Sequence, residues 1–280
     1  MSPDTMVYAL FAAYAGLFGL LFGSFMNVCI ARMPADRSIV FPGSACPKCG
    51  TAIKPYDNVP VLAWLWLGGR CRACKAPISA RYPAVEAAFG VLAVLLFRHL
   101  VPDLADVDAG HLVAFVWYGW LAFCLMALTF IDLEHQIIPD PFSIYSVPVG
   151  VLGALALPAL GYHDTITWQQ SVVGAMVGGL GLWAMAAAAS WWYGLEAMGT
   201  GDAKLMALIG SYFGAVPALV FILVLGSVVG SVVGVTVAVV RRRSLKLAMP
   251  FGPFLALGAL VWLFFGDEVR VTFLPWAFWG

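Results

Sequence analysis

The sequence predicts an all-α polytopic membrane protein with about eight transmembrane helices and a small cytoplasmic zinc-binding segment. Of its 280 residues, 62% are hydrophobic and only 11% are charged, and the mean hydropathy is +0.91. Soluble domains of this length do not have such a composition. The apolar residues are gathered in long stretches, and about 20 such residues are enough for one helical span. A polar segment with four cysteines interrupts the series.

The apolar stretches give the expected order of the spans. We expect them at residues 6–30, 83–100, 112–131, 142–160, 171–192, 203–213, 218–240 and 251–265. Pro139 is expected to stop or redirect the helix before it, because proline lacks a backbone N–H. The chain is accordingly divided into a first transmembrane helix (1–32), a four-cysteine segment (33–81) and a transmembrane core (82–280).

Charge placement predicts the orientation. Thirteen of the 15 lysines and arginines lie in residues 32–81, at Lys204 or in residues 241–246. Basic loops stay in the cytoplasm, so both termini are expected outside. Asp132 and Asp202 then both lie at cytoplasmic helix ends. The net charge of zero says nothing about nucleic acid by itself, and we expect a lipid membrane and no nucleic-acid partner.

Four cysteines form two Cys-x-x-Cys pairs, Cys46 with Cys49 and Cys71 with Cys74. Two such pairs are typical of a structural Zn²⁺ site, in which four thiolates leave no position for an activated water. A reducing compartment favours metal over disulfides. Lone thiols or redox chemistry are the alternative. Cys29 and Cys124 lie inside apolar stretches and are expected to be packing residues.

Two aspartates, Asp132 and Asp202, stand at the ends of apolar runs. An ionised carboxylate in or near a bilayer is costly and needs a partner. Two aspartates in one pocket cannot both ionise cheaply, so one keeps its proton while the other acts as a base. Such a pair could activate water against a peptide bond. Solvated loop carboxylates and the proton relay of a transporter are the alternatives, and His135 is expected to be a bystander.

Several ordered motifs match a known family. The matching stretches are Gly23-Ser-Phe-Met-Asn27 with Arg32, Asn58-Val-Pro60, Ile78-Ser-Ala-Arg-Tyr-Pro-Ala-Val-Glu86, Asp132-Leu-Glu-His-Gln-Ile-Ile-Pro-Asp140 and Met198-Gly-Thr-Gly-Asp202-Ala-Lys204, with the two cysteine pairs. With these motifs the chain resembles the bacterial type IV prepilin peptidases, leader peptidases and N-methyltransferases of the GxGD-type membrane aspartic proteases. A lone Gly-x-Gly-Asp would be weak evidence, whereas the ordered set is specific.

The resemblance implies a function at the cytoplasmic face of the bacterial inner membrane. Family members cleave the basic leader of prepilins and pseudopilins and then methylate the new N-terminus with S-adenosylmethionine. By this resemblance Asp132 and Asp202 are the catalytic pair. The supporting peptidase loop comprises Pro139, Asp140, Gly199, Gly201 and Lys204.

The methyltransferase candidates are assigned by position only: Gly23, Asn27, Arg32 and Glu86. For Asn27 the alternative is a helix–helix hydrogen bond. For Glu86 it is a first-turn carboxylate that favours the helix N-terminus. Two other functions remain open at this point. One is a peptidase without significant methylation, and the remote one is a proton-coupled transporter or a pilus or secretion assembly scaffold.

Overall fold

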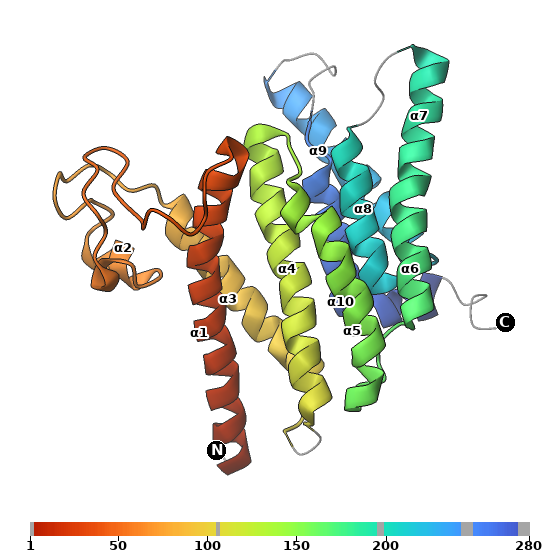
Figure 1. Ribbon diagram of the computed structural model, residues 1–280, viewed down its shortest axis with the longest axis horizontal. Coiled ribbons are helices and arrows are strands. Elements are labelled where there is room, and N and C mark those ends of the chain that lie inside the picture. The colour runs from red at the N-terminus through yellow and green to blue at the C-terminus, as the bar shows by residue number, and fades with distance from the viewer. Residues whose placement is uncertain (1–2, 105–106, 195–198, 242–248, 274–280) are drawn as a thin grey trace. The chain divides into compact units, whose positions relative to one another are not determined.

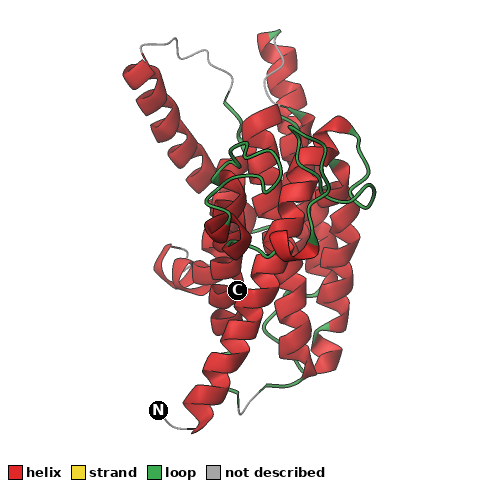
Figure 2. Cartoon of the chain, turned by 90° about the vertical axis from the view of Figure 1, so that its left-hand side faces the viewer, coloured by secondary structure: helices red, strands yellow, loops and turns green. Residues whose placement is uncertain are grey.

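The computed structural model describes residues 3–104, 107–194, 199–241 and 249–273. Within these ranges the chain is helical and has no strand (Figure 2). Five helical stretches are long and apolar enough to cross a membrane: Asp4–Ala35, Arg81–Leu100, Ala109–His135, Trp168–Trp192 and Ala218–Val240. They indicate a multi-pass membrane protein. The predicted all-α membrane class is confirmed, but the count of eight spans is not.

The chain divides into two compact units, Met1–Val107 and Asp108–Gly280. In the first unit, α1 (Pro3–Arg32) packs along α3 (Arg81–Leu100). Small residues bring the two helices close, because a Cβ added at Gly19 would lie 2.6 Å from Ala93 Cβ. The connection between them holds η1 (Met33–Ala35), η2 (Pro55–Asp57) and the short α2 (Leu62–Trp66).

The second unit opens with α4 (Ala109–His135), whose N-cap Asp108 accepts a hydrogen bond from the His111 amide. The helix ends because Gln136 adopts a left-handed conformation with φ 54°. The helix ends before Pro139, as predicted, and a proline at this position could not continue it.

The fourth apolar stretch is not one helix, contrary to the sequence-based expectation. It forms η3 (Asp140–Phe142), η4 (Ile144–Ser146), α5 (Val147–Ala156) and η5 (Pro158–Leu160). Three of these four elements carry a proline in their first two positions. A proline is tolerated there but not inside a helix, where its missing N–H and its ring disrupt the preceding turn.

The fifth stretch is a continuous rod made of α6 (Trp168–Met176), the π-helical η6 (Val177–Gly181) and α7 (Leu182–Tyr193). After it come α8 (Thr200–Phe213), α9 (Ala218–Arg241) and α10 (Gly252–Phe273). The sixth stretch ends as predicted, since α8 stops at Phe213 and Gly214 has φ +76°. The predicted end of the eighth stretch, residue 265, is where α10 is interrupted by non-helical backbone.

The short α8 is the core of this unit and contacts α5, α6, α9 and α10 (Figure 1). Nearly all of its side chains from Ala203 onwards are buried. The close approach of α8 to α6 depends on glycine, because a Cβ added at Gly210 would lie 2.1 Å from the Gly174 carbonyl oxygen. The tight packing of α8 fixes the position of its first turn, which carries Asp202.

Candidate active site and metal centre

Asp132 lies in the last turn of α4 and is buried, with 6% of its surface exposed. Its Oδ2 accepts a hydrogen bond of 3.1 Å from the backbone N–H of Gly252, at the first residue of α10. The absence of a side chain at Gly252 is required here, since an added Cβ would lie 2.6 Å from Asp132 Oδ2. A helix N-terminus favours a negative charge placed in this way.

Asp202 lies in the first turn of α8, after Gly199 as the N-cap. Its neighbour Gly201 packs against Ile138, because an added Cβ would lie 3.1 Å from Ile138 Cβ. Ile138 also lies near Gly252, the residue whose amide donates to Asp132. A Cβ added at Gly252 would lie 3.4 Å from Ile138 Cδ1. Ile138 thus lies both against the turn that carries Asp202 and against Gly252, whose amide donates to Asp132. The fold therefore brings the two predicted aspartates into one site.

The loop residues singled out in the sequence lie beside this pair. Lys204 Nζ donates to Asp140 Oδ1 at 2.5 Å, and both side chains are partly exposed. Pro139 is the N-cap of η3, and its carbonyl oxygen accepts from Ser143 Oγ at 2.9 Å. The ion pair joins the start of α8 to the loop that follows α4. Met198, which precedes Gly199 in the motif, lies outside the described residues.

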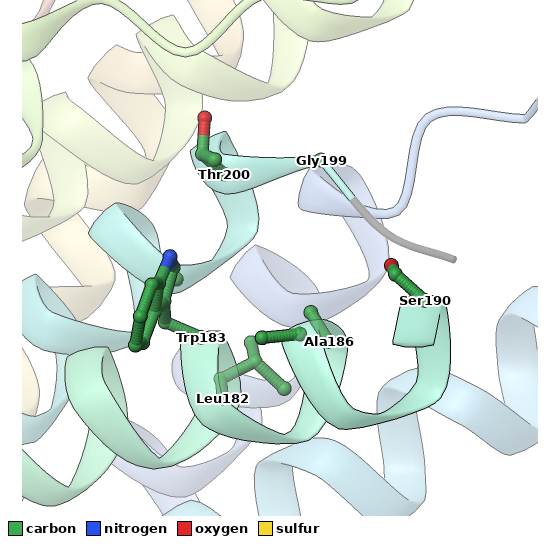
Figure 3. Close-up of a pocket in the computed structure, with 8 residues that line it drawn as sticks. Leu182, Trp183, Ala186, Ser190, Gly199 and Thr200 are labelled. Atoms are coloured by element: carbon green, nitrogen blue, oxygen red, sulfur yellow. The ribbon is translucent and has the colours of Figure 1, made fainter. Parts of the chain in front are cut away.

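A pocket of about 510 Å³ lies between α7 and the start of α8 (Figure 3). Most of its lining is small: Ala186, Ala187, Ser190, Gly199, Thr200 and Ala203, with Leu182 and Trp183 besides. Thr200 and Ala203, the residues on either side of Gly201 and Asp202 in the chain, both line it. Sequence reasoning missed this pocket, although the alanine run before Ser190 was a visible signal of a surface with little side-chain bulk.

The four predicted ligands converge in the first unit. The Sγ atoms of Cys46, Cys49, Cys71 and Cys74 all lie within 4.8 Å of one another. The Cys46 and Cys74 sulfurs are 3.8 Å apart. Zn–S bonds of about 2.3 Å in a tetrahedron place sulfurs about 3.8 Å apart. The cluster could therefore hold a metal ion such as zinc.

The two cysteine pairs sit in matching turns, a similarity that their spacing alone did not reveal. In the first, the Cys46 amide donates to Thr51 O at 2.9 Å and the Gly50 amide to Cys46 O at 2.8 Å. In the second, Cys71 donates to Ala76 O at 2.9 Å and Lys75 to Cys71 O at 3.0 Å. Isolated β-bridges, Ala45 with Ala52 and Arg70 with Pro77, frame the two turns. Each pair thus forms a knuckle that is closed by two backbone hydrogen bonds.

Three of the methyltransferase candidates lie together on α1 and α3. A Cβ at Gly23 would lie 2.8 Å from Glu86 Cα. Asn27 is buried, and its Nδ2 donates to Tyr82 O at 3.0 Å, which is the helix–helix hydrogen bond weighed as an alternative. Glu86 is also buried, and its Oε2 accepts from the Val61 amide at 2.7 Å. Arg32 instead donates to Ser38 O and Gly43 O in the following loop.

The alternative interpretation of Glu86 is wrong. The second span begins at Arg81, two residues before the predicted start, so the first turn of α3 contains no acidic residue. Glu86 lies deeper, in the second turn, and its carboxylate is used by the Val61 amide.

Comparison with known proteins assigns the chain to a family. The model for the bacterial peptidase A24 N-terminal domain matches residues 17–100, and that for the type IV leader peptidase family matches residues 119–235. A protein of Aeromonas hydrophila named prepilin leader peptidase/N-methyltransferase is 35% identical, with 92% of each chain covered. Proteins of the same name from Dichelobacter nodosus and Pseudomonas aeruginosa are each 33% identical, over 93% of this chain. The chain belongs to the type IV leader peptidase family.

The family models also agree with the structural units. The first model ends at residue 100 and the second begins at 119, and the compact units divide at Val107. The candidate methyltransferase residues and the cysteines lie in the first unit of this type IV leader peptidase. Asp132 and Asp202 lie in the second. The sequence-based division instead began the core at residue 82, which places α3 with the second unit. No solved structure matches the chain.

Proposed function

We propose that this type IV leader peptidase cleaves the basic leader of prepilins and pseudopilins and then methylates the new N-terminal amine with S-adenosylmethionine. The observation that supports the proposal is that Ile138 packs against Gly201, next to Asp202, and against Gly252, which donates to Asp132. Asp132 and Asp202 come from motifs 70 residues apart. Relatives that cover nearly the whole chain bear the name prepilin leader peptidase/N-methyltransferase.

Cleavage follows from the chemistry of two neighbouring carboxyl groups. Like charges this close do not both ionise, so the pair holds one proton and titrates as a unit. The ionised member takes a proton from water, and the protonated member hydrogen-bonds the scissile carbonyl oxygen. The Gly252 N–H holds the Asp132 carboxylate in place. We propose that an extended segment of substrate approaches the pair through the pocket that Gly199 and Thr200 border.

The second reaction uses the first unit. S-adenosylmethionine supplies an activated methyl group when it is bound. Asn27 Oδ1 is buried and has no hydrogen-bond partner, so it offers an acceptor for a donor group of this cofactor. We propose that Asn27 helps to hold the cofactor and that Gly23 keeps α1 and α3 close together beside it.

The cysteine cluster is proposed to hold Zn²⁺ in a structural role. Four thiolates complete the tetrahedron, so the ion has no open position for substrate. Metal binding would hold together a segment with few buried apolar side chains.

The proposed location is the bacterial inner membrane, with both sites facing the cytoplasm and both termini outside. The basic residues between α1 and α3 and Lys204 beside the aspartates support this orientation through the positive-inside bias. The basic residues at 242–246 that entered the same argument lie outside the described residues.

The direct test is to incubate the purified protein with a prepilin and labelled S-adenosylmethionine. The expected result is a shortened pilin that carries the label. A shortened pilin without label would indicate a peptidase that does not methylate. A pilin that is neither shortened nor labelled would contradict the proposal.

Gly252→Ala should lower cleavage by about 10- to 100-fold with little loss of stability. The new methyl group would lie 2.6 Å from Asp132 Oδ2, so the carboxylate must turn away, and small displacements of reacting groups cost up to about 100-fold. Gly181→Ala is the matched control, because nothing lies within 4 Å of a Cβ there. Cleavage kinetics and thermal unfolding of both variants check this. Normal cleavage by Gly252→Ala would remove the Gly252 contact from the proposed mechanism.

A further inference from the structure

The backbone at Val61 is held in an unfavourable conformation. Val61 has φ 59° and ψ −53°, and the Leu62 amide donates to the Pro60 carbonyl oxygen at 2.6 Å. These values describe a γ-turn of the rare, positive-φ kind, which is strained. For a β-branched residue a positive φ is an outlier. Strain of this kind persists only where surrounding contacts enforce it.

The enforcing contact comes from a different helix. Glu86 Oε2 accepts the Val61 N–H at 2.7 Å, and the Glu86 residue is only 8% exposed. Glu86 is held in turn by close packing, since its backbone lies against Gly23 of α1. A short hydrogen bond donated by a backbone amide to a buried carboxyl oxygen is a strong contact. The turn at Val61 is thus tied to the α1–α3 pair.

The turn leads directly to the cysteine cluster. Val61 is the N-cap of α2, and α2 carries Trp64. The Trp64 indole N–H donates to Ile78 O at 3.0 Å, and its ring packs on Gly69. The Ile78 amide donates to Gly69 O at 2.7 Å, which closes the second cysteine knuckle. An unbroken series of contacts therefore joins Glu86 to the turn that holds Cys71 and Cys74.

We propose that Glu86 is a positioning residue that holds the Val61 turn and, through α2 and Trp64, fixes the four-cysteine segment against α1 and α3. Its part in methylation rests on the function proposed above. In that reaction Glu86 acts through the Val61 amide and does not touch S-adenosylmethionine. This assignment separates it from Asn27, whose buried oxygen has no partner.

The test compares Glu86→Ala with Glu86→Gln in the full-length, zinc-loaded protein. Hydrogen exchange should quicken about 10- to 100-fold across residues 59–78 in Glu86→Ala, because the amide loses a buried acceptor. Glu86→Gln keeps an acceptor oxygen and should retain most of the protection. On pre-cleaved pilin, Glu86→Ala should lower the kcat of methylation while the KM for S-adenosylmethionine changes less than about twofold.

A second substitution tests whether the effect passes through the turn. Glycine adopts positive φ freely, so Val61→Gly added to Glu86→Ala should restore part of the exchange protection, a non-additive result. Asp36→Gly is the matched control, since Asp36 also has positive φ, at 51°, but lies in a different turn, at the end of η1. It should restore nothing.

Two results would overturn the inference. One is unchanged exchange across residues 59–78 in Glu86→Ala. The other is a large rise in the KM for S-adenosylmethionine with unchanged kcat, which would indicate a direct ligand. A wild-type protein that fails to methylate would instead contradict the proposed function, and the exchange measurements would still decide the role of Glu86.

Discussion

Asp132→Asn and Asp202→Asn should each lower leader cleavage by about 10²–10⁴-fold, the range that general acid–base catalysis contributes. An amide can neither take a proton from water nor share the single proton of the pair. Neither side chain is expected to contribute much to the stability of the fold. Asp132 accepts one hydrogen bond from a backbone N–H, and Asp202 is partly exposed. Folding and metal content should therefore stay near normal. Cleavage assays on purified variants, with elemental analysis, check this.

Asp108→Asn is the matched control for these variants. Asp108 caps the opposite end of the same helix, α4, through the His111 amide. Asparagine caps helices about as well as aspartate, so cleavage should remain within about twofold of wild type. If Asp132→Asn or Asp202→Asn cleaved as well as Asp108→Asn, that aspartate would not belong to the catalytic pair.

Replacing any one of Cys46, Cys49, Cys71 or Cys74 by serine should release most of the bound zinc and lower methylation far more than cleavage. Structural zinc sites contribute on the order of 10 kcal/mol to the folding of small metal-binding segments. The cysteine segment lacks strands, and the described backbone hydrogen bonds around each knuckle are local. The aspartates lie in the other compact unit, so the cleavage step should largely survive.

Cys29→Ala provides the control for the cysteine variants, because Cys29 is buried in α1 away from the cluster. It should keep one zinc per chain and both activities. Elemental analysis and parallel assays of cleavage and methylation measure the outcome. Wild-type protein without stoichiometric metal, or with a disulfide between the pairs, would rule out the zinc site.

Local sequence signals predicted much of the architecture. Apolar length located the candidate spans, and Gly214 correctly marked the end of α8. The Cys-x-x-Cys spacing predicted the thiolate cluster, because two residues between ligands allow one tight knuckle. These predictions succeeded because each depends on residues close together in the chain.

Contacts between distant residues could not be predicted in this way. The Gly252 N–H reaches Asp132 across 120 residues, and neither residue carries a local signal for the other. The same holds for Glu86 and Val61. The breaks in the fourth stretch were visible as prolines, yet hydropathy alone favoured one continuous helix. Tertiary packing decided these features.

In the proposed function two separate sites act in sequence, and the Asp202→Asn protein tests this most directly. It should be incubated with labelled S-adenosylmethionine and either full-length prepilin or pilin that has already been cleaved. Methylation requires the free amine that cleavage creates, so full-length prepilin should remain unlabelled. Pre-cleaved pilin should be labelled at close to the wild-type rate, since Asn27 and the cysteine segment lie in the other unit. Failure to label pre-cleaved pilin by a folded Asp202→Asn protein that binds S-adenosylmethionine would contradict the separation of the two sites.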